Sequence, residues 1–445
     1  MQRETHLQYE TTWAIKGDAQ NLLLMKGETA IIRPQFQRPF QVITETPMTP
    51  LERRTVGSLA LLYSFRMLGL FMVLPLLALY AADTPGATPA MIGLALGAYG
   101  LTQALLQIPL GWLSDLVGRK PVIIGGLLFF ALGSVVAAQA DTLWGIVIGR
   151  GLQGAGAIAS TVMALVADLT RDEQRTKAMA MVGMSIGLSF ALALILGPLM
   201  AAAGGLSSVF WLTAVLAVTG ILIVMFRVPT PQASPQQHEE VGARGHLIGR
   251  SLRDPALVRL NVGVFALHFV LMASFLVVPG LIEGLAGIER DRHWQVYLPA
   301  LVLSIAAMVP MMIIAERGGR LRAMFLLAIV AVFSSMALLG TAGNSIMLYL
   351  SLWLFFAGFN YLEATLPSLI SKTVFAGGKG TAMGVYSTCQ FLGAFAGGAL
   401  GGWLLQHYGL SALVGACLVL CGLWVLFALP RQNSPELGAT EVTGA

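Results

Sequence analysis

Charged side chains are scarce in this sequence. Asp, Glu, Lys and Arg make up 11% of its 445 residues, whereas a soluble domain carries roughly 25%. So few charges cannot cover the surface of a water-soluble protein of this size. Hydrophobic residues reach 56%, and the 50 glycines fit a membrane chain, since glycine is frequent in membrane helices. The composition therefore excludes an ordinary soluble protein and predicts one that lies in a membrane.

Cysteine is rare too, and nothing in the sequence indicates a metal or a cofactor. Cys389, Cys417 and Cys421 lie in apolar stretches without a histidine at metal-ligand spacing, so we expect ordinary buried thiols. Neither a zinc-protease H-E-x-x-H nor a phosphate-binding loop occurs. These absences argue against an enzyme.

Long apolar runs recur along the chain, each bounded by charge, Gly or Pro. One membrane-spanning helix needs about 20 residues. The runs predict twelve spans, near residues 55–80, 89–113, 121–139, 143–167, 177–203, 207–227, 259–283, 294–315, 322–341, 345–371, 380–406 and 411–429.

The segments outside the spans define the expected domain organisation. Residues 1–47 are polar and contain no apolar run long enough for a signal peptide, so we expect a disordered leader or a mis-assigned start, with translation beginning at Met48. An N-terminal six-helix bundle follows over 48–227, and a cytoplasmic linker over 228–258, with an amphipathic helical piece from Leu247 to Leu260. A C-terminal six-helix bundle covers 259–430, and 431–445 is expected to be a disordered cytoplasmic tail.

Basic residues gather at one end of the predicted spans. With both termini in the cytoplasm, Arg290 and Arg292 are the only basic residues in the outer loops. Cytoplasmic loops of membrane proteins carry an excess of Lys and Arg, so this bias sets the orientation and favours an even number of spans. It also explains the net charge of +5 without a nucleic-acid partner.

The two groups of six spans repeat each other weakly. A shift of 204 residues places Gly197 on Gly401 and Gly205 on Gly409. Such duplicated halves are typical of transporters whose binding site lies between two bundles near the middle of the membrane.

The loop between the second and third spans reads G-W-L-S-D-L-V-G-R-K, from Gly111 to Lys120. It resembles the G-x-L-a-D-r-x-G-r-k signature of the major facilitator superfamily, with Leu116 where an arginine is usual. The resemblance implies an all-α membrane protein with the major facilitator fold, in which two six-helix bundles are related by pseudo-two-fold symmetry.

Further stretches support this resemblance. The sequence from Arg150 to Gly156 is similar to the family's R-x-x-q-G-x-g pattern. Gly197-Pro198 resembles the core of a signature associated with antiporters, at which the helix would bend, although the glycine pair usual soon afterwards is missing. The YajR-type branch of bacterial drug:proton antiporters is the most similar pattern, on the stretches 66–75, 363–372 and 380–387. That branch often ends in a small cytosolic α+β domain, which we do not expect here.

Four ionisable side chains fall inside predicted spans: Glu363, Arg150, Arg66 and His268. Placing a charged side chain at the centre of the membrane costs about 2.5–3.5 kcal/mol, even on the scale measured by membrane insertion, which gives the lowest values. Such residues are therefore rare in spans, and each of the four is a functional candidate. Glu363 is either a proton-coupling acid or a structural acid paired with a base. Arg150 either tunes that acid, binds an anionic substrate, or braces the N-terminal bundle. Arg66 either acts in transport or extends its side chain to the membrane–water interface. His268 either exchanges protons or is a packing residue of an apolar helix.

A second group of charged residues lies at the predicted cytoplasmic mouth. By the family resemblance it forms a conformational switch that holds the bundles together in the outward-facing state. The alternative is that these charges only set the orientation of the chain. The members are Gly111, Asp115, Gly118, Arg119, Lys120, Asp168 and Arg171.

Polar and aromatic residues of the spans are candidates for a substrate cavity. Periodicity does not show which face of a helix looks inward, so contact with other helices or lipid is the alternative. The candidates are Tyr99, Gln103, Gln107, Gln153, Asn360, Tyr361 and Tyr386.

Together these features favour a proton-coupled efflux antiporter of small apolar or cationic compounds. It would act as a monomer in the bacterial inner membrane, with a small-molecule substrate, protons and the lipid bilayer as its partners. One alternative is a transporter of a metabolite such as a sugar or organic anion, with Arg150 contacting the ligand. The other is a non-transporting membrane sensor.

Overall fold

The computed structural model describes residues 47–230, 244–375 and 378–428. Within these ranges the chain forms helices joined by short turns, and no strand occurs there. Apart from Pro47, the predicted leader and tail lie outside the described residues. The all-α class is therefore confirmed for the part of the chain that the structure describes.

The first half of the chain, residues 47–227, begins at a well-capped helix. The Thr49 side chain accepts a hydrogen bond from the Glu52 amide, while the Glu52 carboxylate accepts one from the Thr49 amide. The fourth predicted span is interrupted at 156–158, where Gly156 packs against the backbone of Gly126. The elements of this half are α1 (Pro50–Tyr80), η1 (Ala81–Asp83), α2 (Pro89–Val117), α3 (Arg119–Ala138), α4 (Leu143–Ala155), α5 (Ala159–Asp168) and α6 (Asp172–Arg227).

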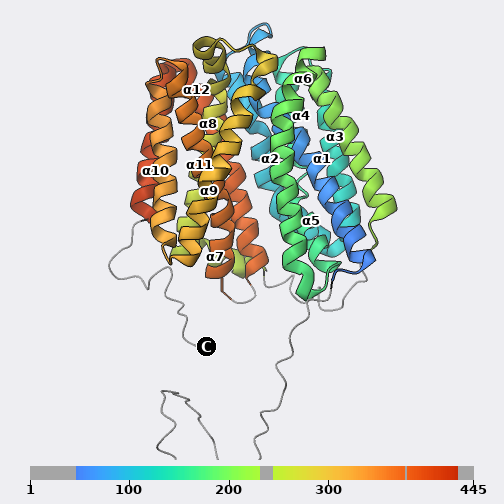
Figure 1. Ribbon diagram of the computed structural model, residues 1–445. Coiled ribbons are helices and arrows are strands. Elements are labelled where there is room, and N and C mark those ends of the chain that lie inside the picture. Colours follow the sequence, from blue (N-terminus) through green and yellow to red (C-terminus); the bar gives the residue numbers. More distant parts are fainter. Residues whose placement is uncertain (1–46, 231–243, 376–377, 429–445) are drawn as a thin grey trace, which may run out of the picture. The chain divides into compact units, whose positions relative to one another are not determined.

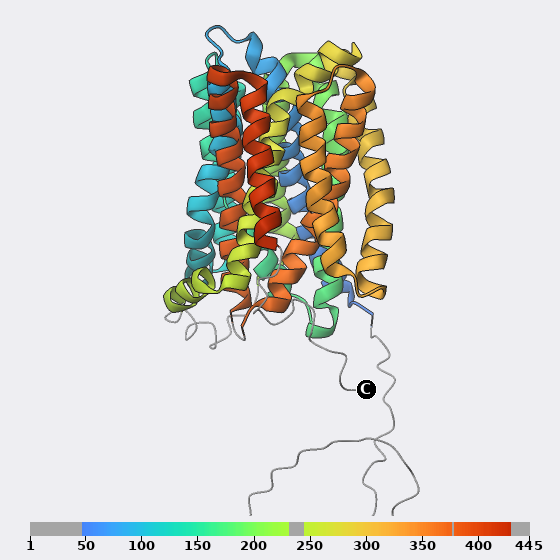
Figure 2. The ribbon, with the colours of Figure 1, turned by 90° about the vertical axis from the view of Figure 1, so that its left-hand side faces the viewer.

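The second half, residues 244–428, begins with a short helix that lies across the end of the bundle (Figure 2). The amphipathic piece predicted from Leu247 to Leu260 is divided in two, because Asp254 caps a new helix that starts at Pro255. The elements are α7 (Arg244–Arg253), α8 (Pro255–Ala286), η4 (Arg290–Arg292), α9 (Trp294–Arg317), α10 (Leu321–Gly340), α11 (Ser345–Thr373) and α12 (Lys379–Ala428).

Two helices are long enough to cross a membrane twice. α6 has 56 residues and α12 has 50, and each turns back at a glycine with left-handed backbone, φ 66° at Gly205 and 79° at Gly409. These two glycines are the pair related by the 204-residue repeat. Ten helical segments are long and apolar enough to span a membrane. With α6 and α12 each crossing twice, the described residues supply the twelve predicted spans.

The two halves stand side by side in Figure 1, with α1 to α6 in blue to green and α8 to α12 in yellow to red. Within the first half α1 packs along α6, and within the second half α8 packs along α12. The boundary between the halves is formed mainly by α2 against α12, with α1 against α8. Side chains of these four helices can therefore contact residues of both halves.

Glycine brings α2 and α12 into backbone contact. A Cβ atom at Gly97 would lie 2.8 Å from the carbonyl oxygen of Phe395, and one at Gly100 would lie 2.7 Å from that of Phe391. In lipid, helices associate by close packing, because apolar burial between them gains little over contact with acyl chains. The contact between the halves therefore depends on these small residues.

We expect Gly97→Ala to destabilise the protein by about 1–3 kcal/mol, the usual cost of overpacking. The added methyl group would press against the Phe395 carbonyl oxygen and separate α2 from α12. The measurement is the thermal denaturation midpoint of the detergent-purified protein. Gly415→Ala is the control, since its Cβ atom meets nothing within 4 Å. Equal midpoints for the two variants would contradict the expectation.

Candidate functional site

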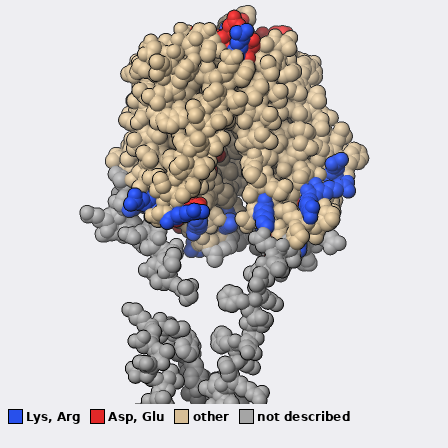
Figure 3. Space-filling model, in the orientation of Figure 1, with Lys and Arg blue, Asp and Glu red and all other residues tan. Residues whose placement is uncertain are grey.

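The two ends of the membrane-spanning unit differ in the charges they carry and in whether the two halves are in contact there. Lys and Arg gather at the end where α1 begins and α12 ends, and a mixed acidic and basic group lies at the other end (Figure 3). The positive-inside bias assigns the basic end to the cytoplasm. On the face shown, a hollow lies between the halves and widens toward the basic end. The halves therefore part toward the cytoplasm.

An ion-pair group joins the halves at the outer end. Arg290, in η4, donates to the carboxylate of Asp83 at 2.6 Å and to that of Glu283 at 2.8 Å. Asp83 ends η1 in the first half, whereas Arg290 and Glu283 belong to the second. Sequence reasoning missed this group, although Arg290 is one of only two basic residues in the predicted outer loops. We call these three residues the outer ion-pair group.

At the cytoplasmic end the predicted switch residues meet around Arg119. Its guanidinium pairs with Asp115 and lies 3.1 Å from a carboxylate oxygen of Asp168. Gly118, with φ 96°, separates α2 from α3 and turns the arginine back toward Asp115. These two ion pairs connect helices of the first half. A role in holding the two bundles together stays a prediction.

The other predicted switch residues lie beside this cluster. Gly111 lets α2 approach α5, since a Cβ atom there would be 3.3 Å from a side-chain oxygen of that helix. Lys120 donates to the carbonyl oxygen of Val228 at 2.8 Å, just beyond α6. Arg171 pairs with Glu52 at 2.9 Å, and this hydrogen-bonded carboxylate raises the pKa of Arg171. The Thr-x-x-Glu capping pattern was the signal for Glu52 that sequence reasoning did not use.

Two arginines are buried in the first half around one tyrosine. Arg66 and Arg150 are 1% and 0% exposed, and their guanidinium carbons lie 5.9 and 5.0 Å from the ring centre of Tyr99. Arg66 also donates to the Tyr99 hydroxyl and to the Gln103 side-chain oxygen, each at 2.8 Å. Arg150 donates to the Gln153 side-chain oxygen at 2.8 Å. The ring therefore stabilises both cations through cation–π contact.

The polar cavity candidates of this half belong to the same buried network. Gln103 donates to the Gln107 side chain at 2.9 Å, and Gln153 donates to Ser134 at 2.8 Å. Together with Tyr99 these glutamines are at most 2% exposed. In this conformation they lie inside the bundle and do not face open space.

The network of Arg66 and Arg150 contains no acidic member. Within the described ranges neither guanidinium forms an ion pair with a carboxylate, and three of their nitrogens are buried without an acceptor: Nε and Nη1 of Arg66 and Nη2 of Arg150. A buried charge without a partner is strongly destabilising. The network is therefore a region in which a negative charge would be stabilised.

In the second half one glutamine connects Glu363 with His268. Gln390, in α12, donates from its side-chain nitrogen to Glu363 Oε1 at 3.1 Å and lies 2.9 Å from His268 Nε2. His268 Nδ1 lies 3.1 Å from the Val264 carbonyl oxygen. Both ring nitrogens of His268 therefore face protein hydrogen-bonding groups. Glu363 Oε2 lies 3.8 Å from His268 Nε2 and has no hydrogen-bond donor.

Aromatic rings lead from this acid toward the first half. Successive ring centres are 5.0 to 6.1 Å apart, within the usual range for contacting aromatic pairs. The row crosses from α8 and α11 to α6 and α1. Its members are His268, Phe359, Phe355, Phe356, Phe190 and Phe71.

A ring contact connects the arginine network to α12 across the boundary between the halves. Tyr99 packs edge-on against Phe391, with ring centres 6.2 Å apart, and Phe391 follows Gln390 in α12. Tyr99, which faces both guanidiniums, thus contacts the residue next to Gln390, and the Gln390 side chain hydrogen-bonds Glu363 in α11. Sequence reasoning missed Gln390, Phe190 and the phenylalanines of α11, because periodicity does not show which face of a span looks inward.

The remaining cavity candidates lie in the second half. Asn360 donates to Ser304 at 2.8 Å and so connects α11 to α9. Tyr361 and Tyr386 are buried, and among the described residues their hydroxyl groups have no hydrogen-bond partner.

The predicted antiporter-type bend lies in a regular part of α6. Gly197 and Pro198 are buried, and a Cβ atom at Gly197 would lie 3.2 Å from the carbonyl oxygen of Met72 in α1. The non-helical backbone in α6 comes later, at Gly204 and Gly205. Gly197 therefore serves the close contact between α1 and α6.

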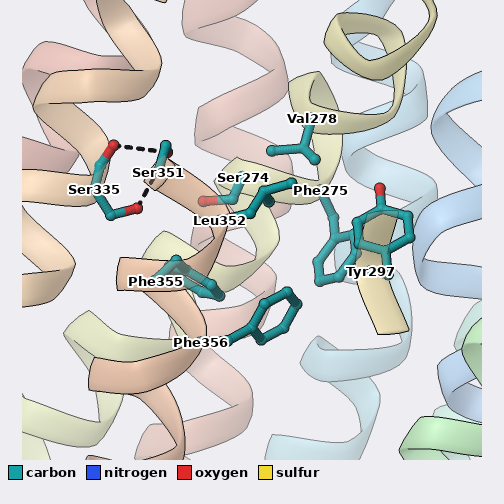
Figure 4. A pocket seen from close by; sticks show the side chains of 9 residues that line it. All are labelled: Ser274, Phe275, Val278, Tyr297, Ser335, Ser351, Leu352, Phe355 and Phe356. Atoms are coloured by element: carbon teal, nitrogen blue, oxygen red, sulfur yellow. Dashed lines mark hydrogen bonds between the residues drawn. The ribbon is translucent and has the colours of Figure 1, made fainter. Parts of the chain in front are cut away.

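A small space lies inside the second half, between α8, α9, α10 and α11. Figure 4 shows Ser335 and Ser351 hydrogen-bonded on one side of it and Tyr297 on the other. With about 10 Å³ for the centre of a water molecule, it holds about one, so it is too small for a substrate. Among the residues described, no three His, Cys, Asp or Glu side chains gather as a metal site would need.

Comparison with known proteins supplies the family. The model of the Major Facilitator Superfamily matches residues 59–398 and 293–444. This chain belongs to that superfamily. The inner membrane transport protein YajR of Escherichia coli (strain K12) is 44% identical over 396 residues, covering 89% of this chain and 87% of that protein. The multidrug resistance protein MdtH of Aeromonas hydrophila is 27% identical over 346 residues, covering 77% and 85%.

Solved structures agree with this membership. A bacterial homologue of the human lysosomal transporter Spinster, in an inward-facing and occupied conformation, superposes with a TM-score of 0.70 at 14% identity, covering 86% of this chain and 97% of that one. The predicted fold, two six-helix bundles related by pseudo-two-fold symmetry, is confirmed. The chain is a secondary transporter of the inner membrane and not an enzyme.

We expect Tyr99→Leu to destabilise the protein more than Tyr99→Phe does. Phenylalanine keeps the ring face beside both guanidiniums and loses only the hydroxyl group, whereas leucine removes a desolvated cation–π contact of about 2 kcal/mol. The measurement is the denaturation midpoint in detergent. Tyr408→Leu serves as the control, because that ring is 65% exposed. A smaller effect for leucine than for phenylalanine would contradict the role given to the ring.

We expect Arg290→Gln to open the outer end. A cysteine introduced by Gln406→Cys reports on this, because the Gln406 side chain accepts from the Ala90 amide across the boundary. In a background without the native cysteines, labelling by an impermeant maleimide should accelerate roughly two- to fivefold, as expected for loss of partly exposed ion pairs. Arg292→Gln removes the neighbouring charge and should leave the rate unchanged. Equal rates for both variants would count against the outer ion-pair group.

Proposed function

We propose that this transporter exchanges protons for small apolar or cationic compounds and so exports them across the inner membrane. The observation that supports the exchange is the setting of Glu363. Its side chain is 38% exposed, one oxygen is held by Gln390, and the other has no donor beside His268. An ionisable group at this depth is a functional candidate, because membrane proteins otherwise exclude it.

The surroundings of Glu363 suit a lipophilic cation. The aromatic row offers π faces, which attract cations within about 6 Å of the ring centre, and apolar surface for the rest of the molecule. Glu363 itself offers a negative charge. The name of the relative MdtH, a multidrug resistance protein, agrees with such a substrate class.

Competition for one carboxylate would couple the two flows. A proton on Glu363 removes the charge that a cation needs, and a bound cation displaces the proton. When the proton leaves, the new negative charge in the second half attracts the buried cations of the first half, which favours approach of the two halves. Each change of occupancy therefore alters the attraction between them.

The two ends of the molecule would respond to this change. In the present conformation the outer ion-pair group is closed, and the hollow widens toward the cytoplasm. Substrate enters from that side. Closure of the cytoplasmic end and separation of Arg290 from Asp83 would complete the movement, with the cluster around Arg119 acting as the inner contact.

Transport of an organic anion is the second candidate. One observation favours it: Arg66 and Arg150 are buried with three unpaired nitrogens, and no carboxylate of the described residues pairs with them. A carboxylate or phosphate of a metabolite would satisfy these donors. In this case Arg150 would contact the substrate and Glu363 would serve another purpose.

In everted membrane vesicles with an imposed proton gradient, we expect lipophilic cations to collapse the gradient. Glu363→Gln should abolish this effect, because the amide cannot bind or release the proton. Glu316→Gln is the matched control, since Glu316 lies exposed at the end of α9. The measurement is substrate-dependent dequenching of a pH-sensitive dye, normalised to the amount of inserted protein.

The outcomes separate the candidates. Collapse with cations in the parent protein and the control, but not in Glu363→Gln, supports the proposal. Collapse with organic anions that survives Glu363→Gln and is lost in Arg150→Gln would favour the second candidate. An undiminished response to cations in Glu363→Gln would overturn the role of this residue.

A further inference from the structure

A second hollow lies at the cytoplasmic end of the second half, away from the boundary with the first. It forms where the start of α8, the start of α10 and the ends of α11 and α12 meet, and it encloses about 600 Å³, part of it open to solvent. Neither the proposed transport cycle nor the switch cluster uses it. We call it the α8–α10 hollow.

Two arginines stand at this hollow without an anionic partner. Arg259 extends from α8 and Arg322 from α10, and both line the space. Within the described ranges neither side chain forms an ion pair or hydrogen bond, and no residue that lines the hollow is acidic. Asp254, the nearest acid along α8, is engaged in capping that helix. The cations therefore face the hollow uncompensated.

The walls of the hollow are apolar and aromatic. Phe325 of α10 packs edge-on against Trp424 of α12, with ring centres 6.2 Å apart. Leu369 adds a wall from α11, and Phe427 is 53% exposed beside it. A small soluble anion would leave this apolar surface uncovered, so the hollow suits a ligand with both a charged and an apolar part.

The position of the hollow matches the depth of lipid headgroups. Arg259 and Arg322 lie in the first turns of membrane-spanning helices, at the end that the charge bias assigns to the cytoplasm. The apolar walls extend from there toward the middle of the membrane. Basic pockets between spanning helices on the cytoplasmic side are suited to anionic lipid headgroups.

We propose that the α8–α10 hollow binds an anionic phospholipid of the inner leaflet. Arg259 and Arg322 hold the phosphodiester and its negative headgroup, and an acyl chain lies against Phe325, Trp424 and Phe427. The lipid thereby joins α8, α10 and α12 at the cytoplasmic end. This binding does not depend on the substrate or on proton coupling.

Native mass spectrometry of the full chain, purified with phosphatidylglycerol or phosphatidylcholine, tests this site. We expect phosphatidylglycerol to be retained preferentially. Replacing Arg259 and Arg322 by glutamine should weaken its retention roughly fivefold per arginine, the factor that ~1 kcal/mol gives. The matched control is the pair Arg317→Gln and Arg320→Gln, which removes the same charge from the nearby loop between α9 and α10 and should retain the lipid.

A filling variant tests the apolar part of the site. Ala256→Phe places a ring in the hollow and leaves both arginines in place, so phosphatidylglycerol retention should fall while net charge is unchanged. If the Arg317/Arg320 control lost as much phosphatidylglycerol as the Arg259/Arg322 variant, surface charge alone would explain the retention. That result would overturn the proposal. Full retention in both the arginine and the filling variants would also overturn it, as would displacement of the lipid by inorganic phosphate.

Discussion

Hydrocarbon offers no hydrogen-bond partner to a peptide group, and the architecture follows from that constraint. Each backbone donor and acceptor in the membrane must be satisfied within its own helix, so the described chain crosses the membrane as helices and reverses between them. Gly205 and Gly409 make equivalent reversals in the two halves. Since apolar burial no longer drives helices together in lipid, the halves meet through glycine, as at Gly97 and Gly100 of α2.

Against this apolar background the few buried charges are arranged unequally. The first half buries two permanent cations around Tyr99 and no acid beside them. The second half presents Glu363, whose charge depends on a proton, with His268 and Gln390 beside it. The buried cations thus lie in one half and the acid in the other. The Tyr99–Phe391 contact joins the ring that faces both arginines to the residue beside Gln390 in the second half.

Local patterns in the sequence predicted the spans, the orientation and the repeat, because each depends on run length, charge bias or spacing. The family resemblance also placed Asp115, Arg119 and Asp168 in one group at the cytoplasmic mouth, and these three residues meet there. Contacts between distant helices left no such pattern. Gln390, Phe190 and the Arg290–Asp83 pair become visible only once α12, α6 and the outer turns are assembled, and Tyr99 gave no sign that its ring faces two arginines.

The burial of fixed cations in the first half alone also makes the protein sensitive to voltage. Arg66 and Arg150 keep their charge in any protein setting, and a charge displaced across the whole membrane experiences about 2.3 kcal/mol per 100 mV. When the halves move relative to each other, these two cations are displaced through part of the membrane's electric field, whether or not substrate is bound. The resting potential of the cell thus biases the conformation of the empty carrier.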